Sequence, residues 1–232
     1  MMQGVFYGVG VGPGSPELIT IKALKIIREC DTIVLPSSPK EECRAYQIVK
    51  ESFPEIDEKK LVAFEFPMSM NKQALDEYHR NTAAALLELC KSGEDIAFLT
   101  IGDPSIYSTY TYVAEILKDK GVECQIISGV PAFIASAAAL NISLAEKNEE
   151  IHIIPGSGDV DEALKLPGTK IFMKNGRQFP KLLERLKRLE EKGQISVKAV
   201  SHCGMECEKQ YQSAFEMDEN ISYLTTIVVK DI

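Results

Sequence analysis

A chain of 232 residues, of which 45% are hydrophobic and 26% charged, can bury a core of its own, so a mainly disordered state is not expected. The formal net charge of −8 argues against a general nucleic-acid binder, because phosphate binding requires a basic face. The sequence shows no secretory signal, no C-x-x-C pair among its six cysteines and no apolar run of the roughly 20 residues that a membrane span needs, which favours a cytoplasmic enzyme in a reducing compartment.

Strands and helices alternate in the N-terminal half. Glycine-interrupted apolar residues predict a strand over 5–11. Ser15 and Pro16 are typical of a helix start, and the apolar spacing that follows predicts a helix to about Glu29. Further along, the pattern predicts strands over 32–35, 61–66 and 95–100 and helices over 72–91 and 107–120.

The alternation continues in the C-terminal half, which indicates an α/β fold. The pattern predicts strands over 124–127, 151–154, 170–173, 197–201 and 223–229 and helices over 132–140 and 179–192. The segment 118–123 is polar and contains a glycine, so it is the best candidate for a boundary between two lobes. The expected division is therefore an N-terminal lobe over 1–119 and a C-terminal lobe over 120–232.

A glycine-rich segment after the first strand carries the first chemical signal. Glycines at a strand end let the backbone approach a ligand, and a helix start offers free N–H groups. The dinucleotide fingerprint G-x-G-x-x-G fails here, because counting from Gly8 or Gly10 puts Pro13 or Ser15 at its sixth position. The P-loop also fails, because no Gly-Lys-Ser/Thr follows. A turn that only packs strand against helix remains the alternative.

The segment 8–20, GVGVGPGSPELIT, resembles the opening signature of the tetrapyrrole methylases. Three further signatures of that family follow in its order: Gly-Asp-Pro with Tyr-Ser-Thr at 102–109, Ser-Gly-Val-Pro-Ala at 128–132, and the weaker Ile-Phe-Met-Lys at 171–174. Four matches in order cover nearly the whole chain. The form Gly-Asp-Pro-x-x-Tyr-Ser-Thr-Tyr is similar to the members that methylate C20.

The chain departs from the family's pattern at three positions. Ser128 stands where proline is usual, Pro131 where threonine is usual, and Lys174 where glycine is usual. These departures concern individual cofactor contacts and leave the expected fold unchanged.

The resemblance implies two α/β lobes with the active site in the trough between them, and a homodimer. It implies that S-adenosyl-L-methionine (SAM) donates a methyl group to C20 of precorrin-2 or of its cobalt-bearing counterpart. The N-terminal lobe would carry the glycine-rich loop on the substrate side, and the C-terminal lobe would contribute to SAM binding. The residues that the family pattern places at SAM are Ile101, Gly102, Asp103, Ile106, Pro131, Ala132, Met173, Cys203 and Gly204. Asp103 could face the cofactor's positive charge or simply cap the turn that follows it.

The tetrapyrrole carries many carboxylates, which favour N–H donors and basic side chains. The segment Gly12–Pro13–Gly14 and the helix start after it could supply N–H groups, and the candidate charges are Lys40, Arg44, Lys174 and Arg177. No catalytic base is evident. If 107–120 is one helix, Tyr107 and Tyr110 share a face, and either could flank the macrocycle or receive the C20 proton; Tyr112 points elsewhere. A core role for these tyrosines is the alternative.

No metal site is expected. Cys203 and Cys207 form a Cys-x3-Cys spacing with His202 beside it, which lacks a fourth ligand and the spacing of structural zinc. His79 and His152 are expected to be structural or exposed.

Three other functions stay open. The first is a neighbouring tetrapyrrole methylase that acts on uroporphyrinogen III or on another corrin carbon. The second is a nucleotide-binding or regulatory protein whose glycine-rich turn holds a phosphate. The third is a diphthine-type methyltransferase that modifies a protein.

Overall fold

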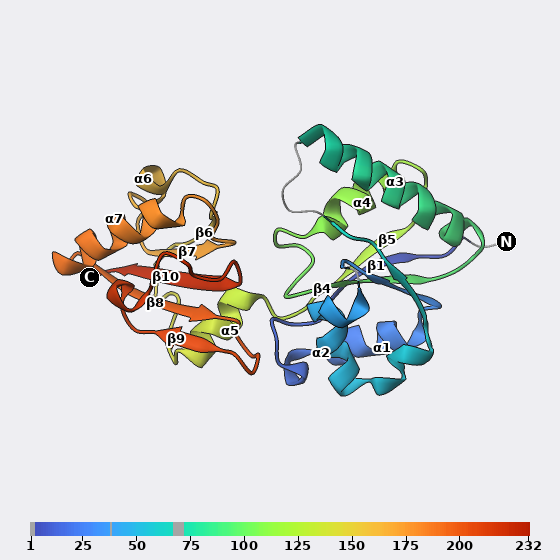
Figure 1. The fold of residues 1–232 in the computed structure, drawn as a ribbon, viewed down its shortest axis with the longest axis horizontal. Coiled ribbons are helices and arrows are strands. Elements are labelled where there is room, and N and C mark those ends of the chain that lie inside the picture. Colours follow the sequence, from blue (N-terminus) through green and yellow to red (C-terminus); the bar gives the residue numbers. More distant parts are fainter. Residues whose placement is uncertain (1–2, 38, 67–71) are drawn as a thin grey trace. The chain divides into compact units, whose positions relative to one another are not determined.

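A computed structural model describes residues 3–37, 39–66 and 72–232 and divides the chain into two compact units, residues 1–131 and residues 132–232. Each unit has its own sheet and its own core (Figure 1), which confirms the predicted α/β class. The expected boundary after residue 119 is too early. The strand β5 (Cys124–Ile127) pairs with β1 (Phe6–Gly10), so it belongs to the first sheet.

In the described part of the first unit, five parallel strands form a sheet in the order β3-β2-β4-β1-β5. The remaining strands are β2 (Thr32–Leu35), β3 (Lys60–Ala63) and β4 (Ile96–Thr100). Figure 1 shows α1 (Ile21–Glu29) and α2 (Arg44–Ser52) on one face and α3 (Lys72–Lys91) and α4 (Thr109–Lys118) on the other. Because both faces are covered, the central strands β2, β4 and β1 are almost entirely buried, whereas the edge strands β3 and β5 are partly exposed.

Alternation along β4 shows how the two faces are filled. Ile96 and Phe98 pack in the cluster that contains residues of α3 and α4, whereas Ala97 and Leu99 pack in the cluster of α1 and α2. All six cysteines lie within the described ranges and have free thiols, and three of them are buried in these two clusters: Cys30, Cys43 and Cys90. A reduced cysteine packs there as a small apolar side chain.

The helix that Ser15 and Pro16 predict is interrupted. Ser15 caps only a short 3₁₀ turn, η1 (Pro16–Leu18), and α1 starts afresh after Thr20. The hydroxyl oxygen of Thr20 accepts the N–H of Ala23 at 3.1 Å, so Thr20 is the true helix cap. Two further 3₁₀ turns in this unit are η2 (Lys40–Glu42) and η3 (Pro54–Glu58).

The helix α2 was not predicted. It is short, and it follows a proline-containing turn and the charged run 40–44, both of which are typical of a loop. Its inner face is nevertheless apolar, with Ala45, Ile48 and Val49 buried against the sheet. Tertiary burial therefore stabilises a helix that local sequence signals do not indicate.

The second unit, all of which is described, contains a mixed sheet in the order β6-β7-β10-β8-β9. Its strands are β6 (Ile151–Pro155), β7 (Thr169–Met173), β8 (Ile195–Ser201), β9 (Lys209–Tyr211) and β10 (Thr225–Asp231). Only β6 and β7 pair in parallel. The short elements β9, α6 (Val160–Ala163) and η4 (Ala214–Glu216) were not predicted.

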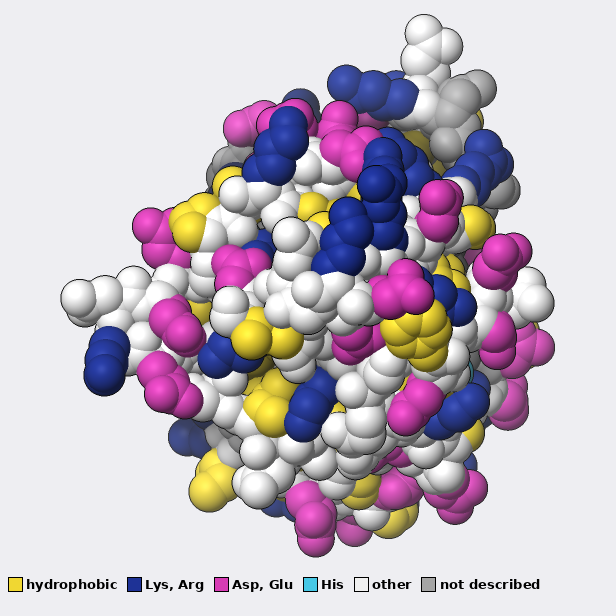
Figure 2. Space-filling model, turned by 90° about the vertical axis from the view of Figure 1, so that its left-hand side faces the viewer, with side chains coloured by type: hydrophobic (Ala, Val, Ile, Leu, Met, Phe, Trp, Pro, Cys, Tyr) yellow, Lys and Arg dark blue, Asp and Glu magenta, His cyan; other side chains and the backbone are white. Residues whose placement is uncertain are grey.

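Two helices pack against this second sheet and contribute to its hydrophobic clusters. Ile227 and Val229 of β10 pack with residues of α7 (Phe179–Glu191), and Val228 between them packs with Ala137 of α5 (Ala132–Ala139). On the face that Figure 2 presents, acidic and basic side chains are interspersed with single apolar ones. The negative net charge is therefore not gathered into one patch on that face.

Candidate functional site

The loops after β1 and β4 meet at the carboxyl-terminal edge of the first sheet. The N–H of Gly102 donates to the carbonyl oxygen of Gly12 at 2.7 Å, and the two residues form an isolated antiparallel bridge. Their φ angles are 76° and 79°, in the left-handed region that favours glycine. Ligands in parallel α/β sheets bind beyond this edge of the sheet. The backbone conformation thus accounts for a glycine at each of these two positions. Both positions lie where the sequence predicts a ligand.

The loop after β5 packs against the same two loops. A Cβ atom on Gly129 would lie 2.2 Å from the carbonyl oxygen of Gly102, and one on Gly10 would lie 2.5 Å from the nitrogen of Gly129. Three segments that are distant in sequence therefore touch through their main chains. Because no side chain fits between them, the glycines form a compact edge of bare backbone.

The carboxylate of Asp103 ties two of these loops together. Its Oδ1 accepts the N–H and the hydroxyl of Ser105, at 2.8 and 2.5 Å, and its Oδ2 accepts the N–H of Gly129 at 3.0 Å. Asp103 is only 7% exposed. Of the two roles that the sequence left open, these contacts support the turn cap. The N–H of Ile106 closes the turn by donating to the carbonyl oxygen of Asp103 at 3.1 Å.

The two candidate tyrosines do not share a helix face, so that prediction is wrong. The helix α4 begins only at Thr109, and Ser108 caps it by accepting the N–H of Tyr110 at 3.1 Å. Tyr107 lies before the cap, with a φ of 49° and 39% of its surface exposed. Tyr107 thus lies outside the helix, whereas Tyr110 is its second residue, so no helix face carries both side chains.

Tyr110 is a core residue. It is 2% exposed, and its hydroxyl donates to the carbonyl oxygens of Gln125 at 2.9 Å and Phe6 at 3.2 Å. Burial raises the pKa of this hydroxyl well above its ordinary value. Its ring occupies the space that a side chain at Gly8 would need, since a Cβ there would lie 2.5 Å from the ring. Tyr110 therefore supports the sheet, and of the two tyrosines only Tyr107 stays a candidate for the site.

The two basic side chains of the first unit that the sequence predicts at the substrate have different surroundings. The Lys40 ammonium lies 2.9 Å from the Asp57 carboxylate, which also pairs with Lys50 at 2.8 Å and accepts the Tyr46 hydroxyl. Hydrogen bonds from these groups hold the pKa of Asp57 well below its ordinary value. The charge of Lys40 is thus compensated locally, whereas Arg44 is exposed in the first turn of α2. The N–H-bearing segment 12–14 is buried.

In the second unit, the predicted residues lie at the carboxyl ends of β7 and β8 and at the start of α5. Met173 ends β7 and packs against the cluster that contains Ala137 and Ile171. Cys203 is 7% exposed, and burial raises the pKa of its thiol. The N–H of Gly204 donates to the Glu208 carboxylate at 2.7 Å. Ala132 is the first residue of α5.

Both strand ends are tied to the start of β10. The side-chain N–H of Asn175 donates to the carbonyl oxygen of Thr225 at 2.8 Å, and the N–H of His202 donates to the carbonyl oxygen of Leu224 at 3.0 Å. The sequence did not indicate Asn175 here or Ser105 in the first unit as site residues. Ser105 had a local signal, because an Asp two residues before a serine is typical of an Asx turn. Asn175 had none, because its partner is 50 residues away.

The histidines have structural surroundings. His79 is 5% exposed, its ring stacks on that of Tyr112 at 5.1 Å between centroids, and burial lowers its pKa. The ring of His152 lies 3.2 Å from the Glu150 carboxylate. Among the residues that the structure describes, no group of three or more His, Cys, Asp or Glu side chains could hold a metal ion. Within the same residues, none of the helices combines the length and the apolar character that crossing a bilayer requires.

Comparison with known proteins places the chain among enzymes of one kind. A sequence model described as Tetrapyrrole (Corrin/Porphyrin) Methylases matches residues 5–217. The chain is 36% identical over 228 residues to a probable cobalt-precorrin-2 C(20)-methyltransferase of Methanocaldococcus jannaschii, a match that covers 97% of this chain and 95% of that relative.

Solved structures show the same fold. The cobalt precorrin-4 methyltransferase CbiF is similar with a TM-score of 0.76 and 19% identity, over 97% of this chain and 94% of that one. A uroporphyrin-III C-methyl transferase from Thermus thermophilus, complexed with S-adenyl homocysteine, is similar with a TM-score of 0.65 and 17% identity, over 98% and 97% of the two chains. At these identities the likeness concerns the fold alone.

Proposed function

This chain belongs to the tetrapyrrole (corrin/porphyrin) methylase family, and from that premise we propose that it transfers the methyl group of SAM to C20 of cobalt-precorrin-2 or precorrin-2. It is a methyltransferase of cobalamin biosynthesis, and the predicted membership of this family is confirmed. The observation that carries the C20 assignment is the identity of 36% to a C(20)-methyltransferase across 97% of the chain. That match extends through both units.

The reaction makes limited demands on side-chain chemistry. When bound, SAM supplies the methyl group and a sulfur leaving group, so the protein need not activate a leaving group. A bond forms between C20 and the methyl carbon, the bond from that carbon to sulfur breaks with its electrons left on sulfur, and C20 then loses a proton. The protein must align the reacting atoms and exclude water, and alignment alone can lower such a barrier by roughly 7–11 kcal/mol.

In the first unit, we assign the cofactor to the turn after β4 and the loop after β5, at Ile101, Gly102, Asp103, Ile106 and Pro131. The compact backbone edge supports this assignment, because close main-chain contacts fix it in position: a Cβ on Gly129 would lie 2.2 Å from the carbonyl oxygen of Gly102. The carboxylate of Asp103 is already engaged with Ser105 and Gly129, so its role is to fix the shape of this edge. In the second unit, we assign the cofactor to Ala132, Met173, Cys203 and Gly204.

For the substrate, we assign Gly12, Pro13, Gly14 and Arg44 of the first unit. Lys40 is a weaker choice for a carboxylate partner, because Asp57 already compensates its charge. Tyr107 is the remaining tyrosine that could lie near the ring. We also propose that the protein is a homodimer and that it is located in the cytoplasm. Light scattering on the purified protein tests whether it is a dimer.

The decisive experiment is incubation of the protein with SAM and precorrin-2, with and without cobalt, followed by NMR of the product. We expect one new methyl group at C20 and one equivalent of S-adenosyl homocysteine. A methyl group at another carbon would identify a neighbouring tetrapyrrole methylase. SAM binding without turnover of any tetrapyrrole would favour a diphthine-type enzyme, and calorimetric binding of NAD or ATP without SAM would favour a nucleotide-binding protein.

A further inference from the structure

One peptide group at the carboxyl edge of the first sheet is held by side chains at both of its polar atoms. The hydroxyl of Thr20 donates to the carbonyl oxygen of Ser128 at 3.2 Å, and the N–H of Gly129 donates to Oδ2 of Asp103 at 3.0 Å. This oxygen and this N–H belong to the same peptide group, and in the planar trans form they point in opposite directions. Two segments that are distant in sequence therefore hold this peptide group from opposite sides.

The Thr20 hydroxyl makes one bond that helix capping does not require. Its oxygen caps α1 by accepting the N–H of Ala23 at 3.1 Å. A cap needs only an acceptor, and an aspartate, which has no hydrogen to donate, caps at least as well as a threonine. The hydrogen of the Thr20 hydroxyl goes instead to Ser128, 108 residues away in sequence. The second bond therefore links the segment before α1 to the loop after β5.

The peptide group that Thr20 holds lies next to residues assigned to SAM. Its nitrogen is also packed against the end of β1, because a Cβ on Gly10 would lie 2.5 Å from it. Two residues beyond Gly129, Pro131 is one of the positions assigned to the cofactor, and Asp103 on the other side is another. A rotation of this peptide group would therefore displace parts of both loops that the cofactor is assigned to in the first unit.

We propose that Thr20 is a positioning residue for SAM, whose hydroxyl orients the peptide group between residues 128 and 129 and, through it, the loop after β5. This inference rests on the proposed function. A loop that is held in its binding conformation loses less conformational freedom when a ligand binds, so the ligand binds more tightly. Thr20 acts through the loop and need not touch the cofactor itself.

The test uses substitutions that separate the cap from the bond to Ser128. Thr20→Ser keeps both bonds, Thr20→Asp keeps the cap but cannot donate to Ser128, and Thr20→Val loses both. Ser213→Ala in the second unit is the matched control. The Ser213 oxygen accepts the N–H of Phe215 at 3.1 Å and its hydroxyl donates to Glu190 at 2.8 Å, so this variant also loses one accepted and one donated bond.

We expect the Kd of SAM, measured by calorimetry, to rise about threefold to tenfold in Thr20→Asp and Thr20→Val, as loss of one hydrogen bond predicts. The added carboxylate does not explain this loss, because SAM carries a net positive charge. Thr20→Ser and Ser213→Ala should stay within about twofold of the wild type. Thr20→Val and Ser213→Ala should melt at a lower temperature, since each loses a cap, and Thr20→Asp should melt near the wild type.

Two results would overturn the inference. One is a wild-type Kd of SAM in Thr20→Asp. The other is an equal loss of SAM binding in Thr20→Val and Ser213→Ala, which would trace the effect to stability alone. If Thr20→Asp does not fold, the comparison of Thr20→Val with Ser213→Ala decides.

A double-mutant cycle tests whether Thr20 and Asp103 act on the same peptide group. Thr20→Val and Asp103→Asn each release one side of it, so the combined variant should weaken SAM binding by less than the product of the two single effects. Single effects that multiply fully would mean that the two residues act independently, and the proposed route through the shared peptide group would be wrong.

The same measurements separate failure of this inference from failure of the proposed function. If the wild type binds SAM more tightly than Thr20→Asp does but methylates no tetrapyrrole, the proposed function fails and the role of Thr20 stands. If the wild type methylates precorrin-2 at C20 and Thr20→Asp binds SAM equally well, the proposed function stands and the role of Thr20 fails.

Discussion

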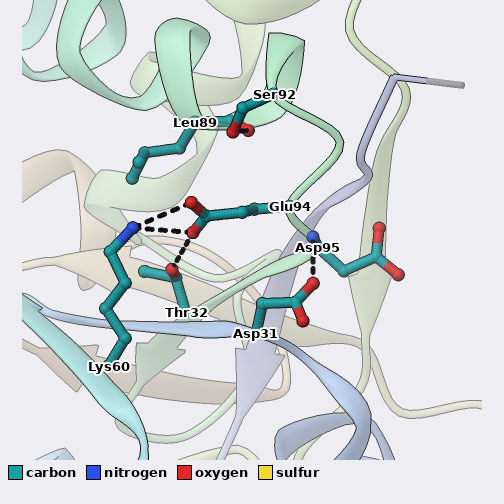
Figure 3. A network of polar contacts seen from close by, with 7 residues as sticks. All are labelled: Asp31, Thr32, Lys60, Leu89, Ser92, Glu94 and Asp95. Atoms are coloured by element: carbon teal, nitrogen blue, oxygen red, sulfur yellow. Dashed lines mark hydrogen bonds and ion pairs between the residues drawn. The ribbon is translucent and has the colours of Figure 1, made fainter. Parts of the chain in front are cut away.

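The two edges of the first sheet are built in opposite ways. At the amino ends of its strands, charged and polar side chains bind one another, as Figure 3 shows. The Lys60 ammonium lies 2.8 Å from both oxygens of Glu94, and Thr32 donates to the same carboxylate at 2.5 Å. Asp31 accepts the N–H of Asp95 at 3.0 Å. This edge fills its space with side chains, so it can hold strands together but offers little room to a ligand.

At the carboxyl ends of the strands, the contacts are made mainly by main-chain atoms instead of side chains. Gly12 and Gly102 bond directly, Gly129 packs against them, and the carboxylate of Asp103 binds N–H groups of these loops. A ligand that approaches this edge meets backbone that is already fixed in position. The difference predicts that changes at the amino edge alter stability alone, whereas changes at the carboxyl edge alter binding and catalysis as well.

The largest effect is expected from Gly129→Ala. Its Cβ would lie 2.2 Å from the carbonyl oxygen of Gly102 and 2.7 Å from the carbonyl carbon of Gly10, so the loops must separate. We expect methyl transfer to fall by about 100-fold, the loss typical of a displacement of about 1 Å near reacting groups. Steady-state kinetics and calorimetric titration with SAM measure it.

Gly121→Ala is the matched control for that variant. Gly121 has a φ of 84°, and nothing lies within 4 Å of a Cβ built on it. Its substitution should cost roughly 1–2 kcal/mol of stability through strain alone and leave SAM binding unchanged. Gly102 is a poorer position for this test, because its φ of 76° strains any side chain whether or not a ligand binds. Equal activity losses at 121 and 129 would contradict the contrast between the edges.

The second-largest effect on SAM binding is expected from Asp103→Asn. An amide cannot accept hydrogen bonds on both of its atoms, so either Gly129 or Ser105 loses its acceptor. The buried N–H left without a partner should cost about 1–3 kcal/mol of unfolding free energy. We expect SAM to bind about tenfold more weakly, which corresponds to about 1.4 kcal/mol. Urea denaturation and calorimetry measure the two quantities. Weaker folding with unchanged SAM binding would show that Asp103 serves the fold alone.

How much of these edges could be predicted from the sequence depends on how local each signal is. Gly102 and Asp103 stand in a turn whose residue types indicate it directly, and the resemblance found the same segment. The bond from Asp103 to Gly129 spans 26 residues, and no local pattern reports it. For the same reason the expected boundary after residue 119 was too early, because β5 joins the first sheet through β1, which lies far away in sequence.

The helices show the same limit. The spacing of apolar residues gave α3 and α7 nearly their full lengths, because long amphipathic patterns are distinctive. It missed α2, which has nine residues, and it began α4 too early. The second error mattered for function, because it put Tyr107 and Tyr110 on one face. Ser108, a good helix cap, was the signal that could have corrected it.

At the amino edge, Glu94→Gln should have a smaller effect. The ion pair with Lys60 is partly exposed, with 26% of the Glu94 side chain accessible, so its loss should cost about 1 kcal/mol or less. The glutamine can still accept the hydroxyl of Thr32. Urea denaturation should show this change, and calorimetry should show the same Kd for SAM as the wild type. A clear fall in SAM affinity would mean that the two edges are coupled.

The smallest effect is a dependence of that stability on pH. Hydrogen bonds from Lys60 and then from Thr32 lower the pKa of Glu94 below its ordinary value of 4.5. A carboxyl group with a lower pKa in the folded state stabilises the fold above its unfolded-state pKa, and this contribution disappears as the pH falls through the folded-state pKa. The difference in unfolding free energy between the wild type and Glu94→Gln should therefore be complete at about pH 7 and shrink as the pH approaches about 3. If urea denaturation gave the same difference at both pH values, the charge of Glu94 would not be what holds the amino edge, and shape or packing at that position would have to explain its contribution.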